Sequence, residues 1–292
     1  MTRPDPHFDS LLPRLPCDRR GFVAGLLATG FAAAVAPALA QTAIHTDGAG
    51  LRAGEILVPA VGAAIPAYRA EPAAGRGHPL VLVVHEIFGV HEYIKDVCRR
   101  LAKAGYQAIA ADLYYRQGDA ARAATVEDAL AIAAAAPDEQ VLADLDACVA
   151  WAARHGGDPA RLAITGFCRG GRTVWLYAAR NAALQAAVAW YGPLDAAPSP
   201  LQPKQPLDVA GKLKAPVLGL YGGRDQGISA EQVAEMREAL GRAGGASQIH
   251  VYAEAGHAFH ADYRPTYRRA EAEDGWRRML AWFSEHGVAP AA

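Results

Sequence analysis

The sequence carries almost no net charge. Its 29 lysine and arginine residues are balanced by 30 aspartate and glutamate residues, which gives a formal net charge of -1 over 292 residues and a pI near 6.8. Without a basic excess the protein has no electrostatic field that would attract nucleic acid, and without an acidic excess it has none for a basic partner. We therefore expect a small molecule as the partner and no nucleic acid.

The sequence is also poor in cysteine. It has four, and Cys17 lies in an amino-terminal segment expected to be removed, which leaves Cys98, Cys148 and Cys168, an odd number that cannot all pair. No CxxC motif and no Cys/His ligand spacing is present, which argues against a structural zinc site. Cys98 and Cys148 lie at helical spacing from apolar residues, which predicts buried, unreactive side chains. Only Cys168 lies at an expected turn.

No apolar run at the amino terminus is long enough to be a convincing membrane anchor. The run at about 22–35 is short and rich in alanine and glycine. Arg19 and Arg20 precede it, and Ala-Leu-Ala at 38–40 follows it as a small-x-small cleavage signal. This order resembles a twin-arginine export signal, although the charged start of an ordinary secretory signal is an alternative.

These features predict a cleaved signal peptide at 1–40 and a mature chain that begins at Gln41. The remaining segment, 41–292, has the length of one large domain, and 52% of the sequence is hydrophobic. We predict a periplasmic or secreted protein that has no membrane contact once the signal is removed.

After the leader, stretches typical of strands and of helices alternate. Residues 54–72 alternate in polarity and are broken by Pro59 and Pro66, which is typical of a β-hairpin at a sheet edge. Residues 79–86 are largely a continuous apolar run, as in a strand buried on both faces. The later segments are predicted as helix 92–105, strand 106–114, a helical region 120–155 broken around Pro137, strand 161–167, a helix from 168, strand 186–192, loop 193–214, strand 215–225, helix 229–244, strand 247–256 and a helix over about 266–286. This order predicts an α/β fold with a mainly parallel sheet, helices on both faces and an amino-terminal β-hairpin.

Four side chains with chemical potential follow expected strands. They are Glu86, Cys168, Asp225 and His257. In a parallel sheet the ligand crevice lies outside the carboxyl ends of the strands, so these side chains are expected at one edge. Their coincidence there is the main argument for an enzyme.

Cys168 stands in Gly166-Phe-Cys-Arg-Gly170, between an expected strand and an expected helix. Gly-x-Cys-x-Gly at such a turn has the form of a nucleophile elbow, in which the helix end favours a thiolate and can hold an oxyanion. Asp225 and His257 then follow in the order nucleophile, acid, histidine that α/β-hydrolases use. His260 is the rival base, and an Asp225 that only caps the helix near Ser229 is the bland alternative.

At this point the sequence resembles the dienelactone hydrolase family, over about residues 54–285. The resemblance is carried by VVHEIFGVHEYIKDVCRRLAKAGYQAIAADLYYRQG at 83–118, GFCRGG at 166–171, LYGGRDQGIS at 220–229 and AGHAFH at 255–260. It implies an α/β-hydrolase fold and a cysteine nucleophile that takes the place of serine.

The resemblance also implies roles for further residues. Glu86 would contact the cysteine at rest and help to form the thiolate, the amides of Ile87 and Arg169 would hold the oxyanion, and Arg116 would help to bind a substrate carboxylate. The alternative for Arg116 is a pair with a neighbouring acid such as Asp119. A second carboxylate-binding arginine of the family would stand at position 261, where this chain has alanine. Arg264 is the nearest substitute, with a surface or salt-bridging role as the alternative, and Arg169 itself could pair with an acid or reach the pocket.

The leading hypothesis is an exported hydrolase of lactones or small carboxylic esters that uses Cys168, His257 and Asp225 and needs no cofactor. One alternative is a non-hydrolytic thiol sensor or ligand-binding protein on the same fold. Another is a metal-binding protein that uses His85, Glu86, His257 and His260, although no HExxH motif supports it. The substrate's identity and the oligomeric state stay open.

Overall fold

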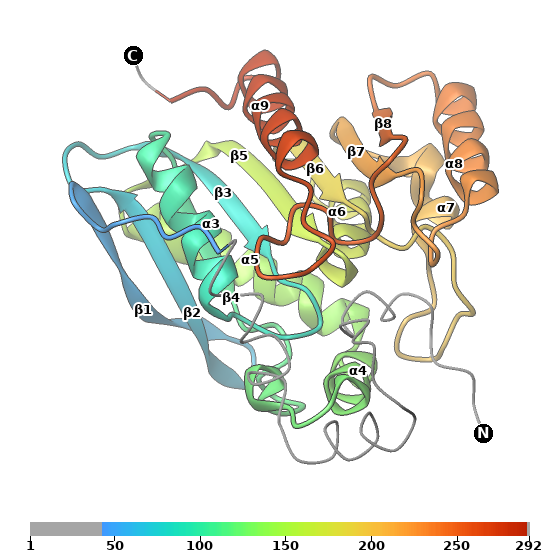
Figure 1. The fold of residues 1–292 in the computed structure, drawn as a ribbon. Helices are drawn as coiled ribbons and strands as arrows, with labels where there is room; N and C mark the ends of the chain where they lie inside the picture. The colour runs from blue at the N-terminus through green and yellow to red at the C-terminus, as the bar shows by residue number, and fades with distance from the viewer. Residues whose placement is uncertain (1–42, 291–292) are drawn as a thin grey trace.

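The computed structural model describes residues 43–290. The expected signal peptide at 1–40 and the expected first residue, Gln41, lie outside that range. Within it, no helix is long and apolar enough to span a bilayer. The described chain folds around one eight-stranded sheet, with α3 and α9 on one face and α5 and α6 on the other (Figure 1).

The strands are β1 (Leu51–Ala60), β2 (Ala63–Pro72), β3 (His78–Val84), β4 (Gln107–Ala111), β5 (Gly157–Phe167), β6 (Leu184–Trp190), β7 (Val217–Gly222) and β8 (Gln248–Tyr252). The helices are α3 (Glu92–Lys103), α4 (Val126–Ala134), α5 (Asp138–Arg154), α6 (Arg169–Arg180), α7 (Pro206–Val209), α8 (Ala230–Ala243) and α9 (Arg269–Glu285), with 3-10 turns η2 (Ala120–Arg122) and η3 (Ala210–Lys212). The predicted break near Pro137 separates α4 from α5. The segment 193–214, predicted as a loop, contains α7 and η3.

The sheet has the order β1-β2-β4-β3-β5-β6-β7-β8. β1 and β2 form the predicted antiparallel hairpin at the edge, and the strands from β4 to β8 in that order pair in parallel. This is the α/β-hydrolase fold with a mainly parallel sheet, as predicted. The chain leaves β3 toward β4 on one side and continues from β5 on the other, so the topological switch point lies between β3 and β5, where open α/β sheets bind ligands.

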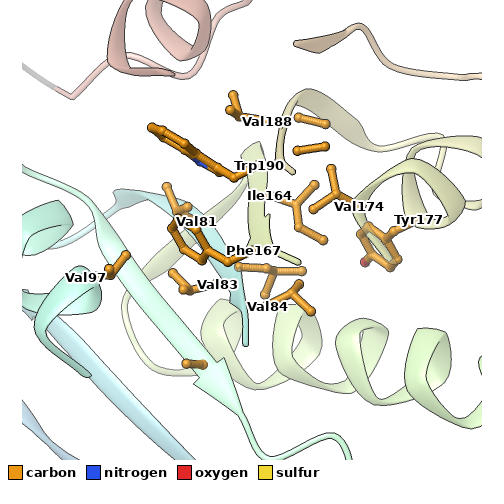
Figure 2. Packing of buried hydrophobic residues seen from close by; sticks show 14 of the residues in the cluster. Val81, Val83, Val84, Val97, Ile164, Phe167, Val174, Tyr177, Val188 and Trp190 are labelled. Carbon is orange, nitrogen blue, oxygen red and sulfur yellow. The ribbon is translucent and has the colours of Figure 1, made fainter. Parts of the chain in front are cut away.

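The central strands are apolar on both faces. Val81, Val83 and Val84 of β3 lie beside Ile164 and Phe167 of β5 in the core, with residues of α3, α6 and β6 around them (Figure 2). Helices on both faces of a parallel sheet require this continuous apolar pattern, because neither side of the strand meets water. The core therefore holds the carboxyl ends of β3 and β5 rigidly side by side.

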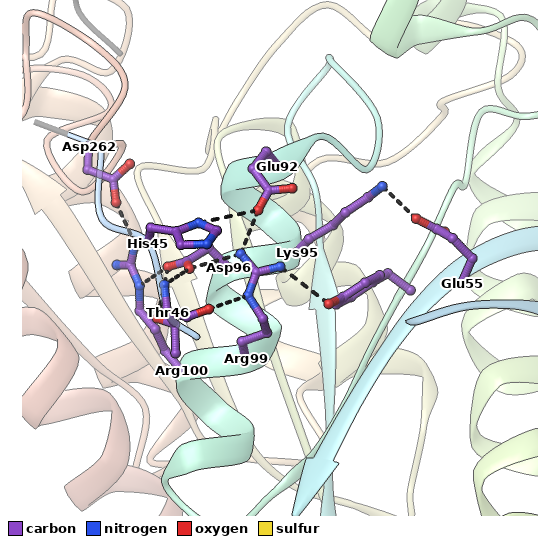
Figure 3. A network of polar contacts seen from close by, with 10 residues as sticks. His45, Thr46, Glu55, Glu92, Lys95, Asp96, Arg99, Arg100 and Asp262 are labelled. Carbon is purple, nitrogen blue, oxygen red and sulfur yellow. Dashed lines mark hydrogen bonds and ion pairs between the residues drawn. The ribbon is translucent and has the colours of Figure 1, made fainter. Parts of the chain in front are cut away.

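A polar network ties α3 to the loop that follows β8. Arg100 donates to Asp96 on its own helix at 2.5 Å and to Asp262 at 2.5 Å (Figure 3). Asp96 also accepts a hydrogen bond from the amide of Thr46 at 2.5 Å, so the start of the described chain is held to the same helix. Asp96 and Asp262 are both nearly fully buried, at 1% and 2% exposure. The loop between β8 and α9 is thus anchored by a buried ion pair.

Breaking this anchor should be costly. We predict that Arg100→Met lowers the free energy of unfolding by about 3 kcal/mol, because the buried carboxylate of Asp262 loses its ion pair, while Asp96 keeps Arg99. Arg122→Met is the matched control, since the pair of Arg122 with Asp119 is exposed on both sides, and its loss should cost under about 1 kcal/mol. Urea denaturation of the two variants measures both values, and equal small losses would contradict the anchoring role.

Candidate active site

Cys168 lies in a strained turn between β5 and α6. Its backbone has φ 52° and ψ -118°, a conformation that costs a non-glycine residue about 1–3 kcal/mol. A Cβ at Gly166 would lie 2.5 Å from the carbonyl oxygen of Gly170, and a Cβ at Gly170 would overlap the carbonyl oxygens of Val84 and His85. The two glycines therefore let the elbow close tightly against the end of β3.

Asp225 and His257 lie in the loops after β7 and β8. An oxygen of Asp225, Oδ2, lies 2.7 Å from Nδ1 of His257, and both residues are buried. The other oxygen accepts hydrogen bonds from the amides of Gly227 at 2.9 Å and Ile228 at 3.2 Å, which fix the carboxylate. Ser229 itself caps α8 by accepting from Gln232, so Asp225 is not the helix cap.

His257 is also under the electrostatic influence of Cys168. Burial alone would favour the neutral ring, but the charge of Cys168, the charge of Asp225 and the hydrogen bond to Asp225 raise the pKa of His257 to about 10. An imidazolium between a carboxylate and a sulfur is the counterion that a thiolate needs. The arrangement can therefore supply a nucleophile and, later, a proton.

His260, the rival base, lies in a different environment. Its Nδ1 is 2.6 Å from the hydroxyl oxygen of Tyr93, and its ring stacks on Phe167 and Trp276 with interplanar angles of 26° and 20°. Burial lowers the pKa of His260 well below its usual range. Among the residues described, the recorded carboxylate–histidine pair beside Cys168 involves His257 and not His260.

Glu86 is completely buried and belongs to a separate charged cluster. Its Oε1 accepts from Arg264 at 3.0 Å, its Oε2 accepts from the hydroxyl of Tyr263, and His91 lies 3.8 Å from Oε2. Burial acts to raise the pKa of Glu86, but Arg264, His91 and Tyr263 outweigh it and lower the pKa to about 2. The carboxylate is therefore ionised at every ordinary pH.

This cluster changes two expectations. Within residues 43–290 the recorded contacts of the Glu86 carboxylate are with Arg264, Tyr263 and His91, and the contact with Cys168 that the resemblance implied is not among them. Arg264 is not a surface residue: it is 2% exposed, and its guanidinium also lies over the rings of Phe88 and Tyr263. The salt-bridging alternative holds, with Glu86 as the partner.

The two expected oxyanion amides come from neighbouring strand ends. Ile87 follows β3 by three residues, and Arg169 is the first residue of α6, directly after Cys168. The first amides of a helix have no acceptor within the helix, so the amide of Arg169 is available to a ligand. Because Gly170 packs on the carbonyls of Val84 and His85, the start of α6 lies against the segment that leads to Ile87.

The side chain of Arg169 has no ion pair recorded among the described residues. Burial lowers the pKa of the Arg169 guanidinium, and the charge of Tyr114 is the largest influence that opposes this shift. Asp138, whose charge acts on Arg169, is paired instead with Arg172, at 2.7 and 2.9 Å. Arg172 thus ties α6 to the start of α5, and Arg169 stays close to Cys168.

Arg116 lies after β4, and its guanidinium is occupied by the protein. It donates to both oxygens of Asp144 on α5, at 2.6 and 3.1 Å, and to the carbonyl of Val61 at 2.9 Å. Asp119, which the sequence suggested as a partner, pairs with Arg122 instead. The expectation that Arg116 offers a free guanidinium to a substrate carboxylate is therefore not met, and its bidentate partner is a buried acid 28 residues further along the chain.

We predict that Arg116→Ala acts on stability rather than on substrate choice. Removing the guanidinium leaves the buried carboxylate of Asp144 unpaired, which should lower the free energy of unfolding by about 3 kcal/mol. Any fall in kcat/KM should be the same for acidic and neutral esters, measured side by side. A loss of about tenfold or more confined to acidic esters, with stability unchanged, would return Arg116 to carboxylate binding.

Sequence reasoning missed several residues that surround the site. Tyr191 follows β6 directly, has φ 37° and packs edge-to-face on His257 with ring centroids 5.2 Å apart. Its place at a strand end was a usable signal, since the same rule located Cys168. Tyr263 and His91 had no such signal, because they reach Glu86 only through tertiary contacts.

No group of three or more histidine, cysteine or acidic side chains in the described chain is placed to hold a metal ion. The residues that the metal-binding alternative needs together have separate partners, since His257 is paired with Asp225 and His260 with Tyr93. The three cysteines of the described range, Cys98, Cys148 and Cys168, are unpaired and buried.

Comparison with known proteins adds independent findings. The model of the Dienelactone hydrolase family matches residues 65–287. A protein of Methylorubrum extorquens named "Putative carboxymethylenebutenolidase" is 55% identical over 291 residues, which span 99% of this chain and 100% of the relative. A protein of the same name from Escherichia coli K12 is 54% identical over 261 residues, 89% of this chain and 96% of the relative.

Solved structures agree with the sequence relatives. The crystal structure of a "Putative Dienelactone Hydrolase" from Klebsiella pneumoniae subsp. pneumoniae MGH 78578 superposes with a TM-score of 0.79 at 54% identity. The superposition covers 80% of this chain and 99% of the Klebsiella chain.

Proposed function

Because the chain belongs to the dienelactone hydrolase family and is a hydrolase of carboxylic esters or lactones, we propose that it works through a catalytic triad of Cys168, His257 and Asp225. The observation that carries this proposal is the buried pair of Asp225 and His257 at 2.7 Å, together with Cys168 at the strained elbow, whose charge helps to raise the pKa of His257. Asp225 fixes the ring and stabilises its charged form.

In the first half-reaction the thiolate of Cys168 attacks the carbonyl carbon. A carbon–sulfur bond forms, and the electron pair of the carbonyl moves to oxygen, where the amides of Ile87 and Arg169 stabilise it. The intermediate then collapses and expels the alkoxide or enolate oxygen, which takes a proton from the imidazolium of His257. In a lactone this step opens the ring and leaves the chain attached to Cys168 as a thioester.

In the second half-reaction His257, now neutral, takes a proton from water as the water attacks the thioester. The same two amides hold the second oxyanion. The carbon–sulfur bond breaks, the thiolate of Cys168 returns beside the imidazolium, and the acid leaves. One water is consumed and no cofactor takes part.

Glu86 and Arg264 belong to this proposal as a buried ion pair. The charge of Cys168 is among the causes that raise the pKa of Arg264, which supports an electrostatic action of the pair on the thiolate. We propose that Arg264 keeps Glu86 ionised and in place. This role does not depend on whether the substrate carries a carboxylate, so acidic and neutral substrates should benefit equally. Carboxylate binding by Arg264 would require a substrate to displace Glu86.

The proposed function is tested by a panel of lactones and small esters, with and without a carboxylate. We expect hydrolysis of at least one class, and we expect iodoacetamide to abolish it while adding one carbamidomethyl group to the peptide that contains Cys168. Full activity after Cys168 is alkylated would overturn the triad. Oxidation of Cys168 without turnover of any ester would favour the thiol sensor instead.

Export is proposed on the sequence alone, because residues 1–40 have the order of a twin-arginine signal. We predict that the protein isolated from its own host begins at Gln41, which amino-terminal sequencing measures. A protein that retains Met1 and fractionates with the cytoplasm would contradict it.

A further inference from the structure

His85 lies directly after β3 and is completely buried, yet both nitrogens of its ring are bonded. Nδ1 lies 2.6 Å from the carbonyl oxygen of Glu86, and Nε2 lies 3.1 Å from the amide nitrogen of Leu113. A carbonyl oxygen can only accept, and an amide can only donate. The ring must therefore carry its proton on Nδ1 and be neutral.

The charge state and the orientation of this ring are both fixed. Burial lowers the pKa of His85 to about 4, although the bond to Glu86 acts in the opposite direction. The ring also stands edge-to-face on Tyr114, with centroids 4.7 Å apart and an interplanar angle of 89°. His85 thus braces the loop after β3 against the loop after β4, and it does so without titrating near neutral pH.

The bond to Glu86 acts on the next amide. The carbonyl of Glu86 and the amide of Ile87 belong to one peptide unit, which is planar and trans. In such a unit the C=O and N–H bonds point in opposite directions, so a donor that fixes the oxygen also fixes where the hydrogen points. His85 holds that oxygen from a ring that cannot rotate.

We propose that His85 is a positioning residue that aims the amide of Ile87 at the oxyanion, an assignment that rests on the proposed hydrolase function. It does not touch the substrate. It acts by holding the carbonyl oxygen of Glu86, which belongs to the same peptide unit as the Ile87 amide that would donate to the oxyanion. Loss of one such donor costs about 100-fold to 1000-fold in kcat, and a misaimed donor should cost less, about 10-fold to 100-fold.

The test compares His85→Leu with His85→Gln and with a matched control. Leucine fills space without either hydrogen bond, whereas the amide of glutamine can donate to one partner and accept from the other. His155→Leu is the control, because His155 makes the same type of bond from Nδ1 to the carbonyl oxygen of Trp151, at 2.7 Å, outside the site.

Two readouts separate positioning from a loss of fold. Ester hydrolysis develops charge on the carbonyl oxygen and needs the oxyanion donors, whereas alkylation of Cys168 by iodoacetamide needs the thiolate and not those donors. For His85→Leu we expect kcat to fall about 10-fold to 100-fold with KM within about twofold, and the alkylation rate to stay within about twofold of the parent. His85→Gln should recover most of kcat, and His155→Leu should keep it.

Other results would overturn the proposal. If kcat and the alkylation rate fall together in His85→Leu, the residue supports the fold or the thiolate and not the oxyanion amide; if kcat is unchanged, it has no role in the reaction. Should His85→Leu not fold, His85→Asn replaces it, since asparagine is too short to span both partners, and equal kcat for Asn and Gln would refute the idea. Failure of the hydrolase function itself looks different, because the parent protein would then hydrolyse no ester.

Discussion

Replacing Cys168 by alanine should lower kcat/KM for the best ester or lactone by a factor on the order of 10^4 to 10^6. The variant keeps the fold, because alanine removes only the sulfur from a residue that is 4% exposed. It loses the atom that forms the thioester, so what is left is the catalysis that binding and the oxyanion amides supply. Steady-state assays at high enzyme concentration measure the residual rate.

The chain offers two matched controls for this variant. Cys98 and Cys148 are also buried and unpaired, and burial raises the pKa of both thiols well above its usual range, so neither is a ready nucleophile. We expect Cys98→Ala and Cys148→Ala to keep kcat/KM within about twofold while losing about 1 kcal/mol of stability from the vacated space. A similar fall in all three variants would mean that Cys168 matters for packing rather than for chemistry.

Cys168→Ser refines the same prediction. The hydroxyl is a far weaker nucleophile than a thiolate at neutral pH unless a base removes its proton, and this site is built around an ion pair rather than a neutral hydroxyl. We expect activity well below that of the parent but above that of Cys168→Ala. Such an order places the chemistry at the side-chain atom and not at the backbone turn.

The strand ends could be read from the sequence because their signals are local. Continuous apolar runs mark β3 and β5, and a residue that follows such a run must emerge at the carboxyl edge of a parallel sheet. Cys168, Asp225 and His257 are found by this rule, and their order along the chain supports the triad. The alternation of strands and helices predicted the α/β fold for the same reason, since periodicity is a property of neighbouring residues.

What lies around those strand ends could not be read in this way. Tyr263 and Arg264 reach Glu86 across 177 and 178 residues, and no spacing rule relates such positions. Arg116 was placed beside Asp119 by closeness in sequence, but the helix α5 brings Asp144 to it instead. Local patterns therefore locate the reacting atoms, whereas the charges that tune them depend on tertiary contacts.

The most severe electrostatic change available in this site is the removal of Arg264. Glu86 is 0% exposed and its pKa lies near 2 because Arg264, with Tyr263 and His91, offsets the cost of burial. In Arg264→Met the cost of burial remains and the main compensating charge is gone. We therefore expect the free energy of unfolding at neutral pH to fall by about 3–5 kcal/mol.

The pH dependence of this loss has a definite sign. In the parent, the pKa of Glu86 is depressed in the folded state, so its stabilisation is present above the ordinary carboxyl pKa of 4.5 and is lost as pH falls toward about 2. In the variant, burial should place the folded pKa above the unfolded one, so that ionisation of Glu86 destabilises the fold as pH rises. The gap between parent and variant should be small near about pH 2, where Glu86 becomes protonated in both proteins, and should widen toward its full value near about pH 7, as urea unfolding at several pH values measures.

The double variant Glu86→Gln with Arg264→Met separates the effect of this ion pair on stability from its effect on activity. Removing both ions leaves no uncompensated charge in this pair, so the free energy of unfolding should return to within about 1–2 kcal/mol of the parent. The part of the pH dependence that comes from titration of Glu86 should disappear. If the pair acts on Cys168, activity should not return with stability, and acidic and neutral esters should be affected alike. Recovery of kcat together with stability would mean that the pair only supports the fold. A loss of activity confined to acidic esters would mean that Arg264 binds the carboxylate of the substrate and not only that of Glu86.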